Sequence, residues 1–243
     1  RLASGCNSSR TRGSISQDAK CWHNINQGLW LAGCVPHREA GGRAATAIGH
    51  SVQAMLEHPQ RAYLLVGAME PEADFADATL AERALNQAAC VVALTPFASE
   101  SIKRVAHVLL PMAAFAETSG SYINLAGMMQ SQTAATAAPG EARPGWKILR
   151  VLANVLGLEG FAQQSSEDVR AELQQLIDAA AGAGAPEALV STHVPAMAAV
   201  SASADLDLGT LDVPMYSIDA VLRRSPALQE TVIARRAVQG AGQ

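Results

Sequence analysis

The polar residues that could bind a cofactor gather in one charge-poor segment, residues 113–131, which reads AAFAETSGSYINLAGMMQS. Glycines and single polar side chains alternate there, a pattern typical of a loop that wraps a ligand. The candidate binding residues are Glu117, Gly120, Asn124, Gly127 and Gln130. Glu117 has no second acid at a fixed spacing, so paired acid–base chemistry is not predicted and we expect this residue to cap or brace the loop.

The rest of the sequence lacks the motifs of catalysis and metal binding. Its six histidines include no HExxH pair, and its four cysteines include no CxxC pair. We therefore expect no catalytic residue, no metal ligand and reduced thiols, while a disulfide stays open as an alternative. The cysteines are Cys6, Cys21, Cys34 and Cys90.

Three further features have a structural explanation that we favour over a functional one. The segment GGRAATAIG, residues 41–49, is rich in glycine but lacks both phosphate-binding fingerprints. Asp74 and Asp77 could accept a hydrogen bond from a ribose hydroxyl, yet acidic residues that open a helix more often complement its dipole. Met128 and Met129 are expected to pack rather than to bind a metal.

Composition narrows the class of protein. The chain has 243 residues, of which 49% are hydrophobic and 16% charged, and its net charge is −4. These values indicate a globular protein with a sizeable core. The sequence shows no basic stripe of the kind that binds nucleic acid, and no apolar run reaches the roughly 20 residues that span a bilayer.

Short apolar runs alternate with helical patterns before the candidate loop. The expected strands are 62–66, 90–97 and 107–112, and the expected helices are 51–59, 78–88 and 99–106. Alternation at this spacing predicts βαβ units with right-handed crossovers. We therefore expect an α/β fold with a doubly wound, mostly parallel sheet flanked by helices, followed by a helical segment and an extended tail.

The strand ends are where this fold places a ligand. In an open α/β sheet, ligands bind beyond the carboxyl ends of the strands. Those ends correspond here to the loops 67–74, 95–100 and 112–130, which we expect to converge. The alternative is that they only close a packed sheet.

Two helices are predicted after the loop. In residues 143–157, one face is apolar and Gly157 is expected to end the helix. In residues 165–182, Ser165 and Asp168 have the spacing of an N-terminal cap. The apolar face of the first helix consists of Trp146, Leu149, Leu152, Val155 and Leu156.

We expect five segments along the chain. An irregular start over 1–28 precedes an α/β domain over 29–160 and a helix over 161–180. A linker rich in Ala, Gly, Ser and Pro over 181–210 then leads to a C-terminal tail over 211–243.

Several ordered segments resemble one protein family. They are GCVPHREAGG, YLLVGAMEPEAD, VVALTPFASESIKRVAHVLLPMAAFAETSGSYINLAGMMQS, PGEARPGWKILRVLANVLGL and, in the tail, YSIDAVLRRSPAL. With these segments, residues 29–160 resemble the molybdopterin oxidoreductase superfamily. Within it, they are similar to the large iron–sulfur subunit of bacterial NADH:quinone oxidoreductase, respiratory complex I.

The resemblance implies an α/β domain whose role differs between branches of the superfamily. In formate dehydrogenases and nitrate reductases, it would help enclose a molybdopterin guanine dinucleotide. In complex I, the domain looks like a retained scaffold without molybdenum, and the iron–sulfur clusters belong to an upstream region. The resemblance also implies other subunits of the complex I peripheral arm as partners, and a peripheral location on the cytoplasmic face of the bacterial inner membrane.

The candidate loop departs from the family pattern. Where the family continues as Asn-x-Glu-Gly-Arg-x-Gln, this chain has Asn124, then Ala126 in place of Glu and Met128 in place of Arg, then Gln130. Loss of the arginine removes a bidentate phosphate donor. We therefore expect a vestigial loop, no cofactor in this segment, and a structural role in the transfer of electrons from NADH to quinone.

Two alternatives remain. One is the cofactor-enclosing part of a catalytic molybdopterin oxidoreductase of the formate dehydrogenase or nitrate reductase type. The other is a free-standing nucleotide-binding module, which the missing glycine fingerprints disfavour.

Overall fold

A computed structural model describes residues 28–123, 128–182, 215–217 and 219–235. The chain divides into two compact units, Arg1–Leu189 and Val190–Gln243. The expected linker over 181–210 and the expected irregular start over 1–28 lie almost wholly outside the described residues.

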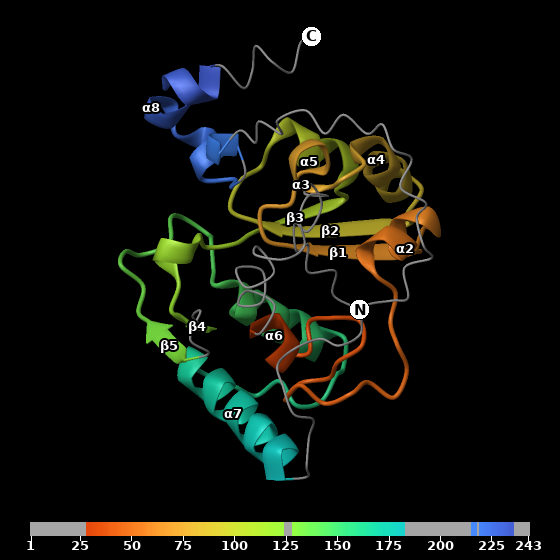
Figure 1. Ribbon diagram of the computed structural model, residues 1–243, viewed down its shortest axis with the longest axis vertical. Helices are drawn as coiled ribbons and strands as arrows, with labels where there is room; N and C mark the ends of the chain where they lie inside the picture. The colour runs from red at the N-terminus through yellow and green to blue at the C-terminus, as the bar shows by residue number, and fades with distance from the viewer. Residues whose placement is uncertain (1–27, 124–127, 183–214, 218, 236–243) are drawn as a thin grey trace, which may run out of the picture. The chain divides into compact units, whose positions relative to one another are not determined.

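The first unit contains a parallel sheet of three strands, β1 (Ala62–Val66), β2 (Cys90–Thr95) and β3 (Val108–Pro111), in the order β1-β2-β3 (Figure 1). The predicted α/β fold with a parallel sheet flanked by helices is therefore confirmed. In a doubly wound sheet, the order of the strands reverses at one point. The three described strands follow one another in sequence order, so no such reversal lies among them.

Short helices connect the strands. Helix α2 (Val52–Glu57) precedes β1, α3 (Pro71–Asp74) and α4 (Ala78–Asn86) connect β1 to β2, and α5 (Glu100–Val105) connects β2 to β3. Figure 1 shows α4 and α5 on the same side of the sheet, as two right-handed crossovers in one direction require. Side-chain oxygens cap three of these helices: Ser51 accepts from Ala54, Asp77 from Leu80 and Ser99 from Ile102.

The core lies between the sheet and these helices. Alternate strand residues point to it, because successive side chains of a strand face opposite sides of the sheet. Leu85 of α4 and Ile102 and Val105 of α5 cover them from the helix side. The strand residues of this core are Tyr63, Leu65, Val91 and Ala93.

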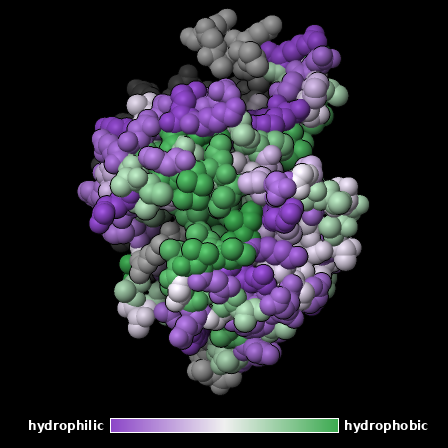
Figure 2. Space-filling view, turned by 180° about the vertical axis from the view of Figure 1, so that it is seen from behind, coloured by the Kyte–Doolittle hydropathy of each residue, from purple (hydrophilic) through white to green (hydrophobic). Residues whose placement is uncertain are grey.

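The opposite face of the sheet is covered less completely. Leu64, Val92 and Leu110 are only half-buried there, and Val108 is 44% exposed. Parallel sheets are normally buried on both faces, so an apolar face left open to this degree is unusual. Figure 2 shows apolar residues gathered across the middle of the surface seen from behind.

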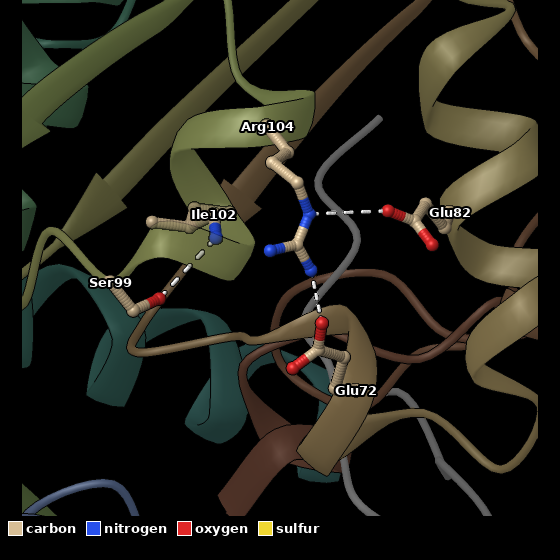
Figure 3. Close-up of polar contacts among 5 residues, drawn as sticks. All are labelled: Glu72, Glu82, Ser99, Ile102 and Arg104. Atoms are coloured by element: carbon tan, nitrogen blue, oxygen red, sulfur yellow. Dashed lines mark hydrogen bonds and ion pairs between the residues drawn. The ribbon is translucent and has the colours of Figure 1, made fainter.

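One arginine ties the three crossover helices together. Arg104 of α5 forms ion pairs with Glu72 of α3 and with Glu82 of α4, the latter at 3.4 Å between Nε and Oε1 (Figure 3). The carboxylates raise the pKa of the Arg104 guanidinium, chiefly through the hydrogen bond to Glu72. The cap that Ser99 provides to Ile102 fixes the start of the same helix, at 3.3 Å.

Beyond the sheet, the 3-10 turn η1 (Phe115–Glu117) leads to an antiparallel hairpin of β4 (Gly120–Ile123) and β5 (Met129–Gln132). Helix α6 (Gly145–Val155) follows the hairpin. Leu158 N–H donates to Ala153 and Gly157 N–H donates to Asn154, with φ of +70° at Gly157. This double hydrogen bond is a Schellman motif, which confirms Gly157 as the end of the helix.

The apolar face of α6 is exposed at its C-terminal end. Val155 is 79% exposed and Leu156 is 65% exposed, whereas Leu149 and Leu152 of the same predicted face are half-buried. The predicted apolar face is therefore only partly covered by the described residues. Periodicity identifies an apolar face, but the helix extends past the residues that could cover it.

Helix α7 (Ser166–Gly182) begins with the predicted cap. Ser165 Oγ accepts from Asp168 N–H at 3.1 Å, and the Asp168 carboxylate accepts from Gln164 N–H at 2.9 Å and Ser165 N–H at 3.0 Å. These N–H donors, that of Gln164 first, hold the pKa of the Asp168 carboxyl below its usual range.

The described residues of the second unit include the short elements η2 (Met215–Ser217), η3 (Leu222–Arg224) and α8 (Pro226–Gln229). The Gln229 side chain ties them together, because its Nε2 donates to the carbonyls of Tyr216 and Leu222 at 2.9 Å each. Among the described residues of both units, no helix is long and apolar enough to cross a bilayer.

Candidate functional site

The loops at the carboxyl ends of the three strands start side by side. Gly67 N–H donates to Leu94 O at 3.0 Å, and Met112 N–H donates to Thr95 O at 3.1 Å. These bonds continue the sheet pairing past the last strand residues. The prediction that the three loops meet at one edge of the sheet is therefore confirmed for the points where they leave the strands.

Several polar side chains at the first two loops bond to backbone groups close by in the chain. Asp74 Oδ2 accepts from Glu70 N–H at 2.7 Å. Asp77 Oδ1 accepts from Leu80 N–H at 2.8 Å, so this residue caps α4 as expected from its place before a helix. In the second loop, Thr95 Oγ1 accepts from Phe97 N–H at 3.1 Å and donates to Phe97 O at 2.9 Å.

The third loop is not the open loop that its composition suggests. Most of residues 120–132 forms the β4–β5 hairpin, in which Gly120 pairs with Gln132 and Tyr122 with Gln130. Figure 1 shows the hairpin beside α7 rather than over the strand ends, and Arg170 of α7 donates to Ser131 Oγ at 3.0 Å. The hairpin is therefore attached to a helix instead of enclosing the ligand edge of the sheet.

The five candidate residues have different positions in this arrangement. Glu117 Oε2 accepts from Ala114 N–H at 2.9 Å, so the carboxylate braces the turn as predicted. Gly120 lies in β4, and Gln130 lies in β5 with an exposed side chain. Asn124 and Gly127 lie outside the described residues. Of the described candidates, Glu117 thus braces a turn, and Gly120 and Gln130 lie on the two paired strands of the hairpin.

Two neighbouring residues differ from the expectation. Gln132, which the sequence reasoning missed, donates from Nε2 to Phe115 O at 2.9 Å and joins the hairpin to η1. The one feature of the sequence that could have pointed to Gln132 is its position two residues after Gln130, which places both side chains on the same face of a strand. Met128 was expected to pack, yet 57% of it is exposed, because it lies next to the tip of the hairpin.

The loops at the strand ends contain acidic but no basic residues, although Glu72 is paired with Arg104 and Glu100 with Lys103 of α5. The three loops carry five carboxylates and no lysine or arginine. Arg143 is next to β3, since its N–H donates to Pro111 O at 3.2 Å, but its guanidinium donates to the carbonyls of Gly140 and Ala142. The carboxylates belong to Glu70, Glu72, Asp74, Glu100 and Glu117.

The described residues contain no group of three His, Cys, Asp or Glu side chains that could hold a metal ion. His107 has a structural role immediately before β3. Its ring Nδ1 accepts from Val91 N–H at 3.1 Å, and its backbone N–H donates to Val91 O at 2.8 Å. Burial raises the pKa of the Cys34 thiol, which favours its protonated form. Cys6 and Cys21 lie outside the described residues.

Comparison with known proteins identifies two groups of relatives. The chain is 31% identical over 142 residues to the mitochondrial NADH-ubiquinone oxidoreductase 78 kDa subunit of Candida albicans, an alignment that covers 58% of this chain and 18% of that protein. It is 34% identical over 106 residues to the assimilatory nitrate reductase catalytic subunit of Bacillus subtilis, covering 43% of this chain and 15% of that protein.

A third relative, the NADH-ubiquinone oxidoreductase 75 kDa subunit of Reclinomonas americana, is 36% identical over 72 residues, or 30% of this chain and 10% of that protein. The chain thus matches less than a fifth of the length of each of these relatives.

The family model for molybdopterin oxidoreductase matches residues 8–155. This match begins inside the segment 1–28, for which the sequence had suggested no relationship, and ends at the last residue of α6. It covers more than half of the chain and all three strands of the parallel sheet. The protein belongs to the molybdopterin oxidoreductase family.

Proposed function

We propose that this chain is the scaffold portion of the large iron–sulfur subunit of a proton-translocating NADH:quinone oxidoreductase. In this role it supports a cluster-bearing region and neighbouring subunits of the peripheral arm, on the cytoplasmic face of the bacterial inner membrane, while electrons pass from NADH to quinone. The similarity to the 78 and 75 kDa subunits of NADH-ubiquinone oxidoreductases supports the choice of complex.

The observation that carries the proposal is the charge of the strand ends. A molybdopterin dinucleotide carries a pyrophosphate, and proteins bind such groups with arginine forks, lysines or exposed N–H groups. The three loops contain five carboxylates and no lysine or arginine, and Met128 occupies the place of the family's arginine. Glu72 and Glu100 are paired with Arg104 and Lys103 of α5, and the loops themselves contain no basic residue beside the carboxylates of Glu70, Asp74 and Glu117. Repulsion between carboxylates and phosphates disfavours the cofactor at this edge.

The hydrogen bonding of the loops supports the same conclusion. The side chains of Asp74, Thr95 and Glu117 already bond to the backbone of their own loops. A ligand would have to compete with each of these bonds. Groups engaged in this way stabilise the turns, which is the property that a scaffold requires.

Exposed apolar surface supports a role inside a larger assembly. Besides Val155 and Leu156 at the end of α6, Val151 and Leu158 are each 53% exposed. Clusters of exposed apolar side chains on soluble proteins mark interaction surfaces. A scaffold that is covered by other parts of a complex would expose such residues when it is seen alone.

The similarity to nitrate reductases favours a second candidate, the cofactor-enclosing part of a catalytic molybdopterin oxidoreductase. In that case, the upstream part of the protein would supply a metal ligand and the cations that the strand ends lack.

Co-purification distinguishes the two candidates. The gene product is tagged at Gln243 in its native locus, membranes are solubilised in detergent, and the eluate is analysed by mass spectrometry and for molybdenum. Recovery of NADH-oxidising flavin and quinone-site subunits without molybdenum is the expected result. Stoichiometric molybdenum without those subunits would overturn the scaffold proposal and support the catalytic one.

A further inference from the structure

The segment before α2 holds a cation that has no anionic partner among the described residues. The guanidinium of Arg38 lies over the ring of Trp30, with Cζ 3.7 Å from the ring centroid. Within the described part of the chain, its side chain makes no hydrogen bond or ion pair, and its Nε–H is buried without an acceptor. By contrast, Arg43 of the same segment pairs with Glu39.

The surroundings hold this stack in place. Trp30 is 8% exposed, and its Nε1–H donates to His37 Nε2 at 3.1 Å. Two backbone hydrogen bonds stabilise the loop next to Arg38. Glu39 N–H donates to Arg43 O at 2.9 Å, and Ala45 N–H donates to His37 O at 3.0 Å. Arg38 is therefore positioned before any ligand arrives, which lowers the entropic cost of binding.

Arg38 lines an open cleft of about 1190 Å³, bounded by this segment, β1, α2 and α4. The volume is slightly larger than the range of about 300–1,000 Å³ that is typical of small-molecule sites. The four carboxylates that line the cleft each accept a hydrogen bond: Glu39 from Arg43 and Thr46, Glu57 from Gln53, Asp74 from Glu70 N–H, and Asp77 from Leu80 N–H. Much of the lining is apolar and includes Leu29, Met55, Leu64, Met69 and Phe75.

We propose that Arg38 binds an oxyanion, a carboxylate or a phosphate group, carried by a small molecule with an apolar part that occupies this cleft. Stacking on Trp30 engages the flat face of the guanidinium and leaves the terminal Nη–H groups, which lie in the plane of the guanidinium, for the ligand. A half-buried charge without a partner is unfavourable, and an oxyanion supplies the missing acceptors through charge-assisted hydrogen bonds.

The cleft adjoins the first strand-end loop, because Met69 and Asp74 line it, but Arg38 itself belongs to the segment before α2. Binding of an anion at Arg38 does not depend on the scaffold role proposed above. Both inferences can hold or fail independently.

A titration followed by NMR tests the proposal on the full 243-residue chain. Sodium phosphate and sodium acetate are added separately at constant ionic strength, and the Arg38 Nε–H resonance, assigned by its loss in Arg38→Lys, is followed. The expected result is a saturable shift with at least one of the two anions. Phosphate alone would identify a phosphate ligand, acetate alone a carboxylate ligand, and no saturable shift with either would overturn the proposal.

Two variants test the site further. Calorimetry measures the affinity of each variant for the anion that shifts the Arg38 resonance. Arg38→Lys keeps the charge but loses the planar fork, so we expect affinity to fall about tenfold or more. Arg43→Gln, which removes a nearby exposed cation, should leave affinity within about twofold, as expected for an arginine outside the site. Equal losses in both variants would show non-specific attraction and would also overturn the proposal.

Discussion

The backbone of Gly41 lies directly against the backbone of Leu176 in α7. A β-carbon added to residue 41 would come within 2.6 Å of the Leu176 carbonyl oxygen, and φ of Gly41 is +83°. This contact joins the segment before the sheet to the helix after it, although the two are far apart in the sequence.

Gly41→Ala should therefore destabilise the first unit more than a positive φ alone would. The φ cost is about 1–2 kcal/mol, and displacement of α7 adds to it. Urea unfolding measures the change. Gly160→Ala is the matched control, because φ there is +89° and nothing lies within 4 Å of the added carbon. Equal losses in the two variants would contradict the importance of the Leu176 contact.

Tyr63 connects β1 to α2 through its hydroxyl. The Tyr63 O–H donates to Met55 O at 2.6 Å and accepts from Gln60 N–H at 2.9 Å. We expect Tyr63→Phe to lower the free energy of unfolding by about 1–2 kcal/mol, because two backbone groups lose their partner. Tyr122→Phe should change it by less than about 0.5 kcal/mol, since Tyr122 is exposed. An unchanged free energy of unfolding in Tyr63→Phe would contradict this prediction and would show that water replaces the hydroxyl.

The ion pairs of Arg104 should contribute to stability at low salt. Arg104→Gln breaks the contacts to Glu72 and Glu82 and should lower Tm by about 2 °C, while Lys103→Gln, which removes only a pair within one helix, should have less effect. In about 1 M NaCl, where the Debye length is about 3 Å, the difference should shrink. A difference that persists at high salt would indicate packing rather than charge.

The Asp168 cap makes the start of α7 sensitive to acid. Because the folded pKa is lowered from the ordinary value of 3.8, its contribution is present above that value and is lost as the pH falls through the folded pKa. Hydrogen exchange of the first turn should therefore be faster in Asp168→Asn than in the native chain at pH 6, with the two converging at about pH 2. A gap that stays constant with pH would contradict the cap.

Local patterns predicted the sheet well. The apolar run at 62–66 is β1 with the same limits, and Ser165 and Asp168 form the cap that their spacing indicates. Such features depend on residues close together in the chain. The parallel pairing of β1, β2 and β3 follows from the alternation of strands and helices because crossovers have one hand.

The hairpin at 120–132 and the Arg38 stack were not predictable in the same way. The hairpin has a polar, glycine-containing first strand without a clear alternation, and its position is set by Arg170, distant in sequence. The exposure of Val155 and Leu156 was not predictable either. Helical periodicity identifies an apolar face, but it does not show whether another segment covers that face.

The content of pterin and molybdenum in the purified protein tests the central claim most directly. The protein is isolated from cells grown with molybdate, oxidised in acid so that any pterin becomes fluorescent, and analysed for molybdenum by mass spectrometry. The scaffold account predicts neither pterin nor molybdenum above the level of a control preparation. One equivalent of either per chain would contradict it and would make the strand ends part of a working cofactor site.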